Sequence, residues 1–203
     1  MTLNTFSLAG ELATLGNNSP DQFQKLLTEA ISGCNLRAVK HLIDAGASPD
    51  ASDTLGNTAL HIALSTRNTG VVNFLLKHNV YLNVQNSLGI TPLHIAARYR
   101  NPALAKLLIN KGAALDVQDK YGETALFWAA RNDRLAIVKL LVDNGASCNL
   151  KSQSNYLAVD LAAHKGYMEI VKILMPKSGD LHNCQRPATP SRIPAIRTAL
   201  NLK

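Results

Sequence analysis

Apolar and polar positions recur along this chain with a long and constant period. The block from Thr91 to Ala97 reads Thr-Pro-Leu-His-Ile-Ala-Ala, and related blocks begin at Thr58, Thr124 and Leu157. Each block starts 33 residues after the one before it. A constant period of this length, built on the same apolar core, predicts a helical repeat protein in which each repeat packs only on its neighbours.

Each block predicts the start of a short helix. Thr91 suits the N-cap position, because its hydroxyl can accept a hydrogen bond from a free backbone N–H of the first turn. Pro92 suits the first helical position, where its missing N–H costs nothing. Leu93 and Ile95 supply apolar anchors, and the alanines that follow them allow a neighbouring layer to approach closely.

A second apolar stripe follows each block and predicts a second helix. Its members are three and four residues apart, the spacing of one helical face. They are Leu104, Leu107 and Leu108 in one repeat and Leu135, Val138, Leu140 and Leu141 in the next. Trp128 has the phase of an inward residue, so we expect it in the core. Gly-Ala pairs at 112–113 and 145–146 end the helix pairs and lead into projecting turns.

The Thr-x-Leu-His block, its spacing and the Gly-Ala turn at 46–50 resemble the ankyrin repeat family. The resemblance implies an all-α repeat solenoid of stacked helix–turn–helix repeats with projecting β-hairpin-like turns. Residues 1–19 are expected to cap the first repeat, and residues 176–203 form a basic, proline-containing tail. Whether the tail caps the last repeat, binds a partner or is merely solvated stays open. The expected repeats are about 20–52, 53–85, 86–118, 119–151 and 152–175.

The resemblance also assigns the histidines a structural role. His61 and His94 are expected to bond to neighbouring backbone and to tie the turns of adjacent repeats together. Phe127 stands at this position in the fourth repeat and argues against the same tie there, and Asp160 replaces the histidine in the fifth.

Composition supports a folded chain and excludes several classes. Of 203 residues, 46% are hydrophobic and 17% charged, enough apolar content for a continuous core. No run of 18 apolar residues predicts a membrane span, and residues 1–15 lack the basic start of a secretory signal. Cys34, Cys148 and Cys184 are odd in number and far apart, which favours a reducing compartment over zinc or disulfide frameworks.

The net charge of +7 does not by itself identify a partner. Residues 176–203 contribute +4 of it, so the repeats are only mildly basic. Binding of nucleic acid or an acidic membrane through this tail is therefore an alternative function, although the tail lacks interleaved aromatic residues.

Motifs for catalysis or cofactor binding are missing from the sequence. It contains no glycine-rich phosphate loop, no G-x-S-x-G and no H-E-x-x-H. His41, His78, His164 and His182 show no metal-ligand spacing. We expect no enzyme activity, cofactor, metal or small-molecule substrate, and we set aside a nucleophilic Cys34 or Cys148 as the weaker reading.

The resemblance implies that a partner binds the projecting turns and the exposed side of the first helices. Tyrosine and arginine dominate the energetics of protein interfaces, and both occur at these positions. Four of them, Arg98, Tyr99, Tyr121 and Arg131, are expected to converge on one groove. The candidate partner-binding residues are Leu55, Leu88, Ile90, Arg98, Tyr99, Lys120, Tyr121, Arg131, Tyr156 and Lys165.

The expected function is a monomeric, non-enzymatic module that binds an acidic and partly apolar segment of another protein. The short ankyrin-like chain with its basic tail resembles bacterial effectors that act in the host cytosol or nucleus. A eukaryotic cytosolic or nuclear adaptor, or a regulatory inhibitor, is the alternative setting. A cytoplasmic location is expected in either case.

Overall fold

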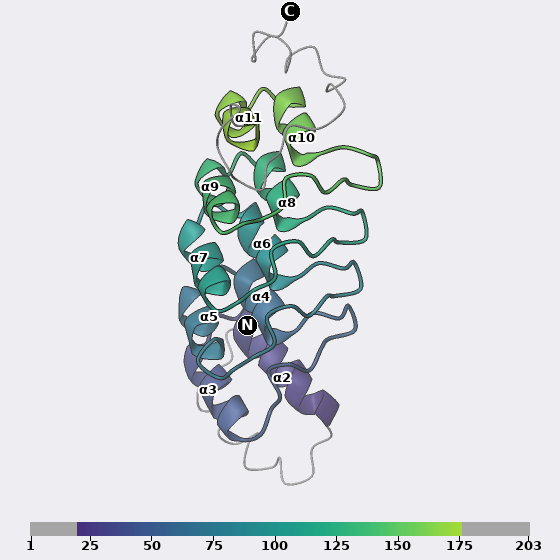
Figure 1. Cartoon of the computed structure of the whole chain (residues 1–203). Coiled ribbons are helices and arrows are strands. Elements are labelled where there is room, and N and C mark those ends of the chain that lie inside the picture. The colour runs from purple at the N-terminus through teal and green to yellow at the C-terminus, as the bar shows by residue number, and fades with distance from the viewer. Residues whose placement is uncertain (1–19, 176–203) are drawn as a thin grey trace, which may run out of the picture. The chain divides into compact units, whose positions relative to one another are not determined.

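The computed structural model describes residues 20–175, and these contain ten α-helices and no strand. The expected N-terminal cap at 1–19 and the basic tail at 176–203 lie outside the described residues. Two compact units divide the chain, the first ending at Ser87 and the second beginning at Leu88. This boundary falls inside the projecting turn that opens the expected third repeat. Within each unit the fold class is the expected all-α helical repeat (Figure 1).

The first unit contains two helix pairs. Helix α2 packs on both α3 and α4, and α4 packs on α5. The helices are α2 (Pro20–Ser32), α3 (Leu36–Asp44), α4 (Ala59–Ser65) and α5 (Thr69–Leu75).

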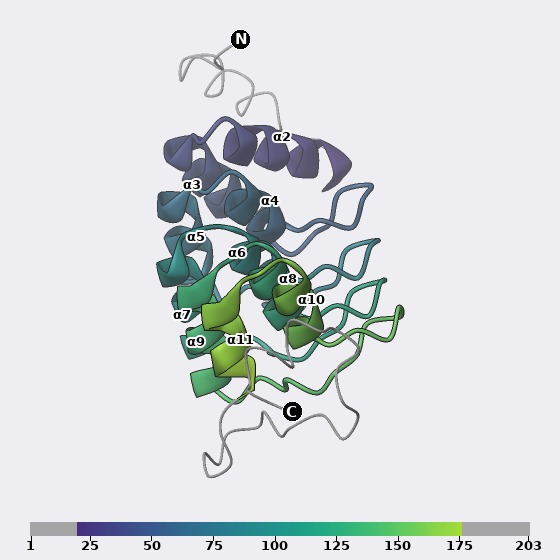
Figure 2. The ribbon, with the colours of Figure 1, turned by 90° about the horizontal axis from the view of Figure 1, so that it is seen from above.

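The second unit contains three helix pairs in two layers. Helix α8 packs between α6 and α10 in the inner layer, while α9 packs between α7 and α11 in the outer layer (Figures 1 and 2). The projecting turns extend from the side of the inner helices (Figure 2). The helices are α6 (Pro92–Arg98), α7 (Pro102–Asn110), α8 (Ala125–Arg131), α9 (Leu135–Asp143), α10 (Ala158–His164) and α11 (Met168–Leu174).

The predicted helix starts are confirmed. Thr58, Thr91 and Thr124 occupy the N-cap positions of α4, α6 and α8, and Pro92 is the first residue of α6. Helix α10 begins after Leu157, whose backbone N–H donates to Asp160 Oδ2 at 2.9 Å. Asp160 therefore replaces the histidine of other repeats as the acceptor at the helix start.

The core confirms most of the predicted stripe and corrects part of it. Leu104, Leu108, Val138 and Leu141 are buried as expected, but Leu107, Leu135 and Leu140 are only half-buried. The core of α9 is completed instead by Ile137 and Val142. A short outer helix packs one narrow face, so apolar residues at the edge of the stripe keep solvent contact.

Trp128 is also corrected, because it is half-buried and lies outside the core. Its neighbour Phe127, at the histidine position, is 2% exposed and fills the interior of this repeat. The indole remains at the surface, where its N–H finds an acceptor in the adjoining turn.

The difference between Leu108 and Leu107 predicts unequal mutational costs. Leu108 is fully buried and Leu107 is not. We expect Leu108→Ala to lower the free energy of unfolding by about 2–5 kcal/mol, the range for a buried leucine, and Leu107→Ala to cost less than half as much. Urea unfolding of the full chain measures both. Equal costs would contradict this division of the α7 face.

Cysteine pairing differs from the sequence-based expectation. Cys148 is buried and disulfide-bonded. Cys34 is exposed and carries a free thiol. The argument from spacing failed because distance along the chain does not measure distance in the fold. The cysteines therefore give no support for a reducing compartment. Separately, no helix between residues 20 and 175 is long and apolar enough to cross a membrane.

Candidate protein-binding surface

A carboxylate closes the projecting turn at residues 119–123. Asp119 Oδ1 accepts from the backbone N–H groups of Tyr121 at 2.8 Å and Glu123 at 2.9 Å. The backbone of Asp119 also exchanges hydrogen bonds with Gly122 and Glu123. Asp119 is consequently buried, whereas Tyr121 is exposed at the turn tip. Asp53 closes the corresponding turn of the first unit through bonds from Leu55 N and Asn57 N.

Successive turns of the second unit are joined through their backbones. Lys120 N–H donates to Leu88 O at 2.8 Å, and Gln153 N–H donates to Tyr121 O at 2.9 Å. Gly122 has a φ of +72°, and a Cβ there would lie 2.8 Å from Gln153 N, so only glycine fits. Gln118 Nε2 adds bonds to the carbonyls of Gly122 and Lys151. The turn tips are therefore held in fixed register.

Large apolar groups stand exposed on these turns. The exposed fractions are 44% for Leu88, 59% for Tyr121 and 54% for Tyr156. We call the surface formed by residues 88–90, 119–123 and 152–156 the turn surface. Leu55, 63% exposed, holds the corresponding place in the first unit. Exposed apolar side chains on consecutive rigid turns are typical of a contact surface for another protein.

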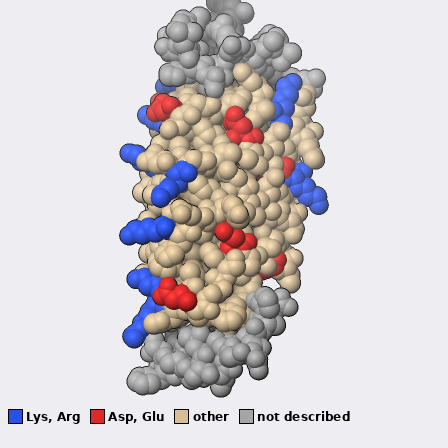
Figure 3. Space-filling model, turned by 60° about the horizontal axis from the view of Figure 1, so that its bottom comes forward, with Lys and Arg blue, Asp and Glu red and all other residues tan. Residues whose placement is uncertain are grey.

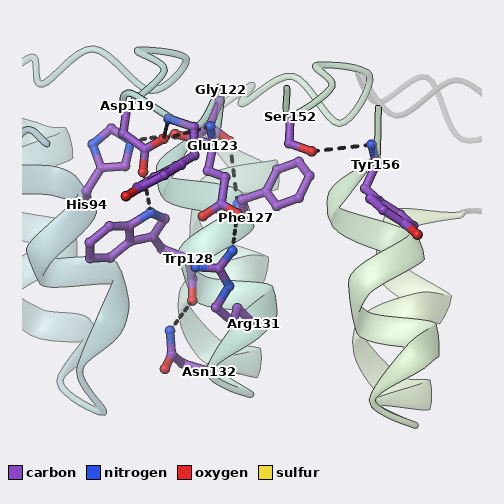
Figure 4. Close-up of polar contacts among 12 residues, drawn as sticks. His94, Asp119, Gly122, Glu123, Phe127, Trp128, Arg131, Asn132, Ser152 and Tyr156 are labelled. Carbon is purple, nitrogen blue, oxygen red and sulfur yellow. Dashed lines mark hydrogen bonds and ion pairs between the residues drawn. The ribbon is translucent and has the colours of Figure 1, made fainter. Parts of the chain in front are cut away.

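A polar cluster connects the turn surface to α8 (Figure 4). Trp128 Nε1–H donates to Asp119 Oδ2 at 3.0 Å, and Arg131 Nη2 forms an ion pair with Glu123 Oε1. Figure 4 shows Trp128 and Arg131 reaching back from α8 toward the turn. Arg131, expected to meet a partner, is thus already bound to an acid of its own chain, although 42% of its side chain remains exposed.

Burial of Glu123 changes its acidity. Glu123 is 8% exposed, and its Oε2 has no hydrogen-bond partner within the described part of the chain. Loss of solvation raises the pKa of Glu123 above its usual value, and the nearby Asp119 adds to this rise. Arg131 opposes both effects by its charge and its hydrogen bond. Burial is the dominant influence, so the ion pair only partly compensates for the cost of the buried carboxylate.

His94 ties this turn to the preceding repeat, as the sequence predicted. Its Nδ1 accepts from Thr91 N–H at 3.1 Å, so Nε2 carries the proton and donates to Glu123 O at 2.9 Å. The imidazole ring of His94 also contacts the Trp128 ring edge to face, with 5.7 Å between the two ring centroids. His61 is equally buried and makes the same bond to Thr58 N–H within its own turn.

The remaining candidates lie further from the turn tips. Ile90 is half-buried, and Lys120 is exposed next to Tyr121. Arg98 is the last residue of α6 and is exposed, while Tyr99 forms the C-cap and is half-buried. Lys165 is the exposed C-cap of α10. Because α6 spans about 10 Å, Tyr99 lies at the helix end remote from the turns, and convergence of Tyr99 with Tyr121 stays a prediction.

Sequence reasoning missed Asp119 and Trp128 as parts of this surface, and although it placed Glu123 there it did not predict the ion pair of Glu123 with Arg131. A signal for Asp119 was available, since Asp53 stands two 33-residue periods earlier and is likewise followed three residues later by glycine. A short acidic or amide side chain before such a glycine is typical of a side-chain-closed turn. No comparable signal existed for the Glu123–Arg131 pair.

Charged side chains are sparse on the face shown in Figure 3. Uncharged residues cover most of that face, and lysine and arginine side chains gather at its margins (Figure 3). Most of these basic side chains lie along one margin of the face, with acidic groups beside them and nearer its centre (Figure 3). Among residues 20–175, no group of three histidine, cysteine, aspartate or glutamate residues is placed to hold a metal ion.

Comparison with known families gives one match. The family model described as ankyrin repeats, in three copies, matches four overlapping segments that together span most of the chain. No curated protein matches the sequence. The matched segments are residues 8–86, 26–119, 71–152 and 99–186.

Proposed function

Because this chain belongs to the ankyrin repeat family, whose repeats are protein–protein interaction modules, we propose that its turn surface binds a segment of another protein. One observation carries the proposal. Leu88, Tyr121 and Tyr156 are large, apolar and exposed on three consecutive turns of one unit. We propose that the module is non-enzymatic and works as a monomer.

Rigidity of the turns favours binding by this surface. The turn-to-turn hydrogen bonds fix the backbone at Leu88 and Tyr121 before any partner arrives. A preformed surface avoids the entropic cost of ordering loops on association, so more of the contact energy appears as affinity. Tyrosine adds a large contact area with few rotatable bonds, which keeps its own ordering cost low.

The distribution of charge favours a partner segment that is acidic as well as apolar. Arg98, Lys120 and Lys165 are exposed, whereas the two acids of the turn at 119–123, Asp119 and Glu123, are buried. A partner therefore meets positive charge and apolar groups together. Complementary charge of this kind raises the association rate and selects against basic partners.

The biological setting is a further part of the proposal. We favour a bacterial effector that acts on host proteins, because of the basic, proline-containing C-terminal tail of the sequence. A eukaryotic adaptor or inhibitor would use the same turn surface with a different partner. Nucleic-acid or membrane binding through the tail, the alternative of another class, predicts an affinity that falls by orders of magnitude between low and moderate salt.

Affinity capture followed by hydrogen-exchange mapping tests the proposed function. The full chain is used to capture partners, and amide exchange is compared with and without each purified partner. We expect slower exchange at 119–123 and 152–156, with the outer helices α9 and α11 unchanged. The variant Lys139→Ala on the outer helix is the matched control and is expected to bind as the wild type does. Protection confined to residues outside 88–165 would overturn the proposal.

A further inference from the structure

The Glu123–Arg131 pair is a feature that the repeat fold does not require. Position 123 corresponds by the 33-residue period to Ile90, and position 131 to Arg98. The fourth repeat thus carries Glu123 eight residues before Arg131. The third repeat carries Ile90 eight residues before Arg98, so isoleucine stands in the place of the acid. Arg131 is ion-paired, while Arg98 has no ion pair within the described residues. Because the preceding repeat folds without the acid, Glu123 needs an explanation other than architecture.

We infer that Glu123 is an internal competitor that holds Arg131 until a carboxylate of the partner segment displaces it. The inference rests on the proposed function and specifies its partner: an extended segment with two carboxylates, one for Arg98 and one for Arg131. Glu123 then sets the threshold for binding, because only a segment that replaces its contact with Arg131 gains the second arginine.

The contact itself leaves room for replacement. Arg131 reaches Glu123 through Nη2 and a single carboxylate oxygen, while 42% of the arginine side chain is open to solvent. A guanidinium has five N–H donors arranged for two-point binding of a carboxylate. The second oxygen of Glu123 is buried without a partner, so the internal pair is incomplete. A partner carboxylate approaching from solvent can bind Arg131 through two bonds.

Displacement is linked to a proton. Burial already raises the pKa of Glu123, and Arg131 is the group that holds it down. The other groups facing Glu123 are Asp119, which raises its pKa further, and His94, which bonds to its backbone carbonyl. When Arg131 turns to the partner, the carboxylate of Glu123 takes up a proton from solvent. The bound state therefore holds more protons, and affinity increases as the pH falls, until the partner carboxylates themselves take up protons.

Helix packing sets the spacing of the two carboxylates. Arg98 and Arg131 end the neighbouring helices α6 and α8, which pack side by side. Packed helix axes lie about 8–10 Å apart, and an extended chain advances about 3.3 Å per residue. The two acids of the partner segment are therefore expected about three residues apart.

Calorimetric titration with a defined peptide tests the inference. The probe is a short capped peptide with two glutamates three positions apart between leucine and phenylalanine residues, titrated into the full chain at several pH values. Glu123→Gln is expected to bind it about tenfold more tightly at pH 7.5. Titration in two buffers of different ionisation enthalpy is expected to show proton uptake for the wild type and none for Glu123→Gln. Ile90→Glu places the same competitor before Arg98 and is expected to weaken binding.

The outcomes separate this inference from the proposed function. Unchanged affinity and unchanged proton uptake in Glu123→Gln would overturn the competitor role, as would absence of binding in that variant, where both arginines are available. Unchanged peptide affinity in Tyr121→Ala/Tyr156→Ala would instead overturn the proposed turn surface. If Glu123→Gln folds poorly, NMR titration of the wild-type Glu123 carboxyl decides, because its pKa is expected to rise when the peptide binds.

Discussion

Replacing Tyr121 and Tyr156 together with alanine is expected to weaken partner binding at least about 100-fold. The two rings are the most exposed aromatic groups of the turn surface. Aromatic residues at the centre of an interface commonly contribute over ~2 kcal/mol each, and a 100-fold loss corresponds to about 2.7 kcal/mol. Affinity for the captured partner, measured by calorimetry, checks this.

The control for the double variant is Tyr81→Ala. Tyr81 is 70% exposed but belongs to the first unit and to neither a turn tip nor an inner helix. We expect it to bind the partner as the wild type does, and neither variant to change the unfolding temperature, because the rings meet solvent in the free protein. Binding that survives loss of both turn tyrosines but fails on removal of residues 177–203 would move the site to the tail.

Replacing His94 with phenylalanine is expected to lower the free energy of unfolding by about 2–5 kcal/mol. The buried imidazole joins Thr91 to the carbonyl of Glu123. Its loss leaves the buried Thr91 N–H without an acceptor, which costs about 1–3 kcal/mol. It also removes one of two hydrogen bonds to the Glu123 carbonyl, which still accepts from Asp119 N–H, at a cost of about 0.5–1.5 kcal/mol. Phe127 shows that a phenyl ring of this size is buried at the equivalent position of the next repeat, so loss of packing is small.

Urea unfolding of His94→Phe measures that cost. Under conditions in which the variant is fully folded, its affinity for the partner is expected to stay near that of the wild type. His94 is buried beneath the turns and does not itself reach the surface. A change in unfolding free energy below about 1 kcal/mol would show that the histidine tie is weaker than its hydrogen bonds suggest.

Features that repeat along the chain were predictable from the sequence. Thr91 and His94 hold the same roles as Thr58 and His61 one period earlier, because the first helix of each of these repeats begins with the same threonine–histidine hydrogen bond. Stacking of similar repeats then places the same contacts in each layer. The exposed tips Leu88 and Tyr121 were predictable for the same reason, since the period assigns them to one position of the turn.

Features unique to one repeat were not predictable in this way. Trp128 has an inward phase, but its indole N–H is drawn to Asp119 at the surface. Glu123 and Arg131 are eight residues apart, and their pairing depends on a closed turn and a following helix whose relative direction the sequence does not state. Side-chain chemistry specific to one layer has no second copy in the chain to reveal it.

The backbone hydrogen bonds between successive turns hold the turn surface together, whereas its side chains are left to contact a partner. The main-chain N–H groups of Lys120 and Gln153 fix the turn tips, so the side chains of Leu88 and Tyr121 are not needed to hold the turns in place. Such a surface can change its target by substitution at the tips while its architecture stays constant. Ser154 occupies the tip position of the last turn. An aromatic residue there would extend the exposed apolar surface of Leu88 and Tyr121 to a third tip without a change in the backbone.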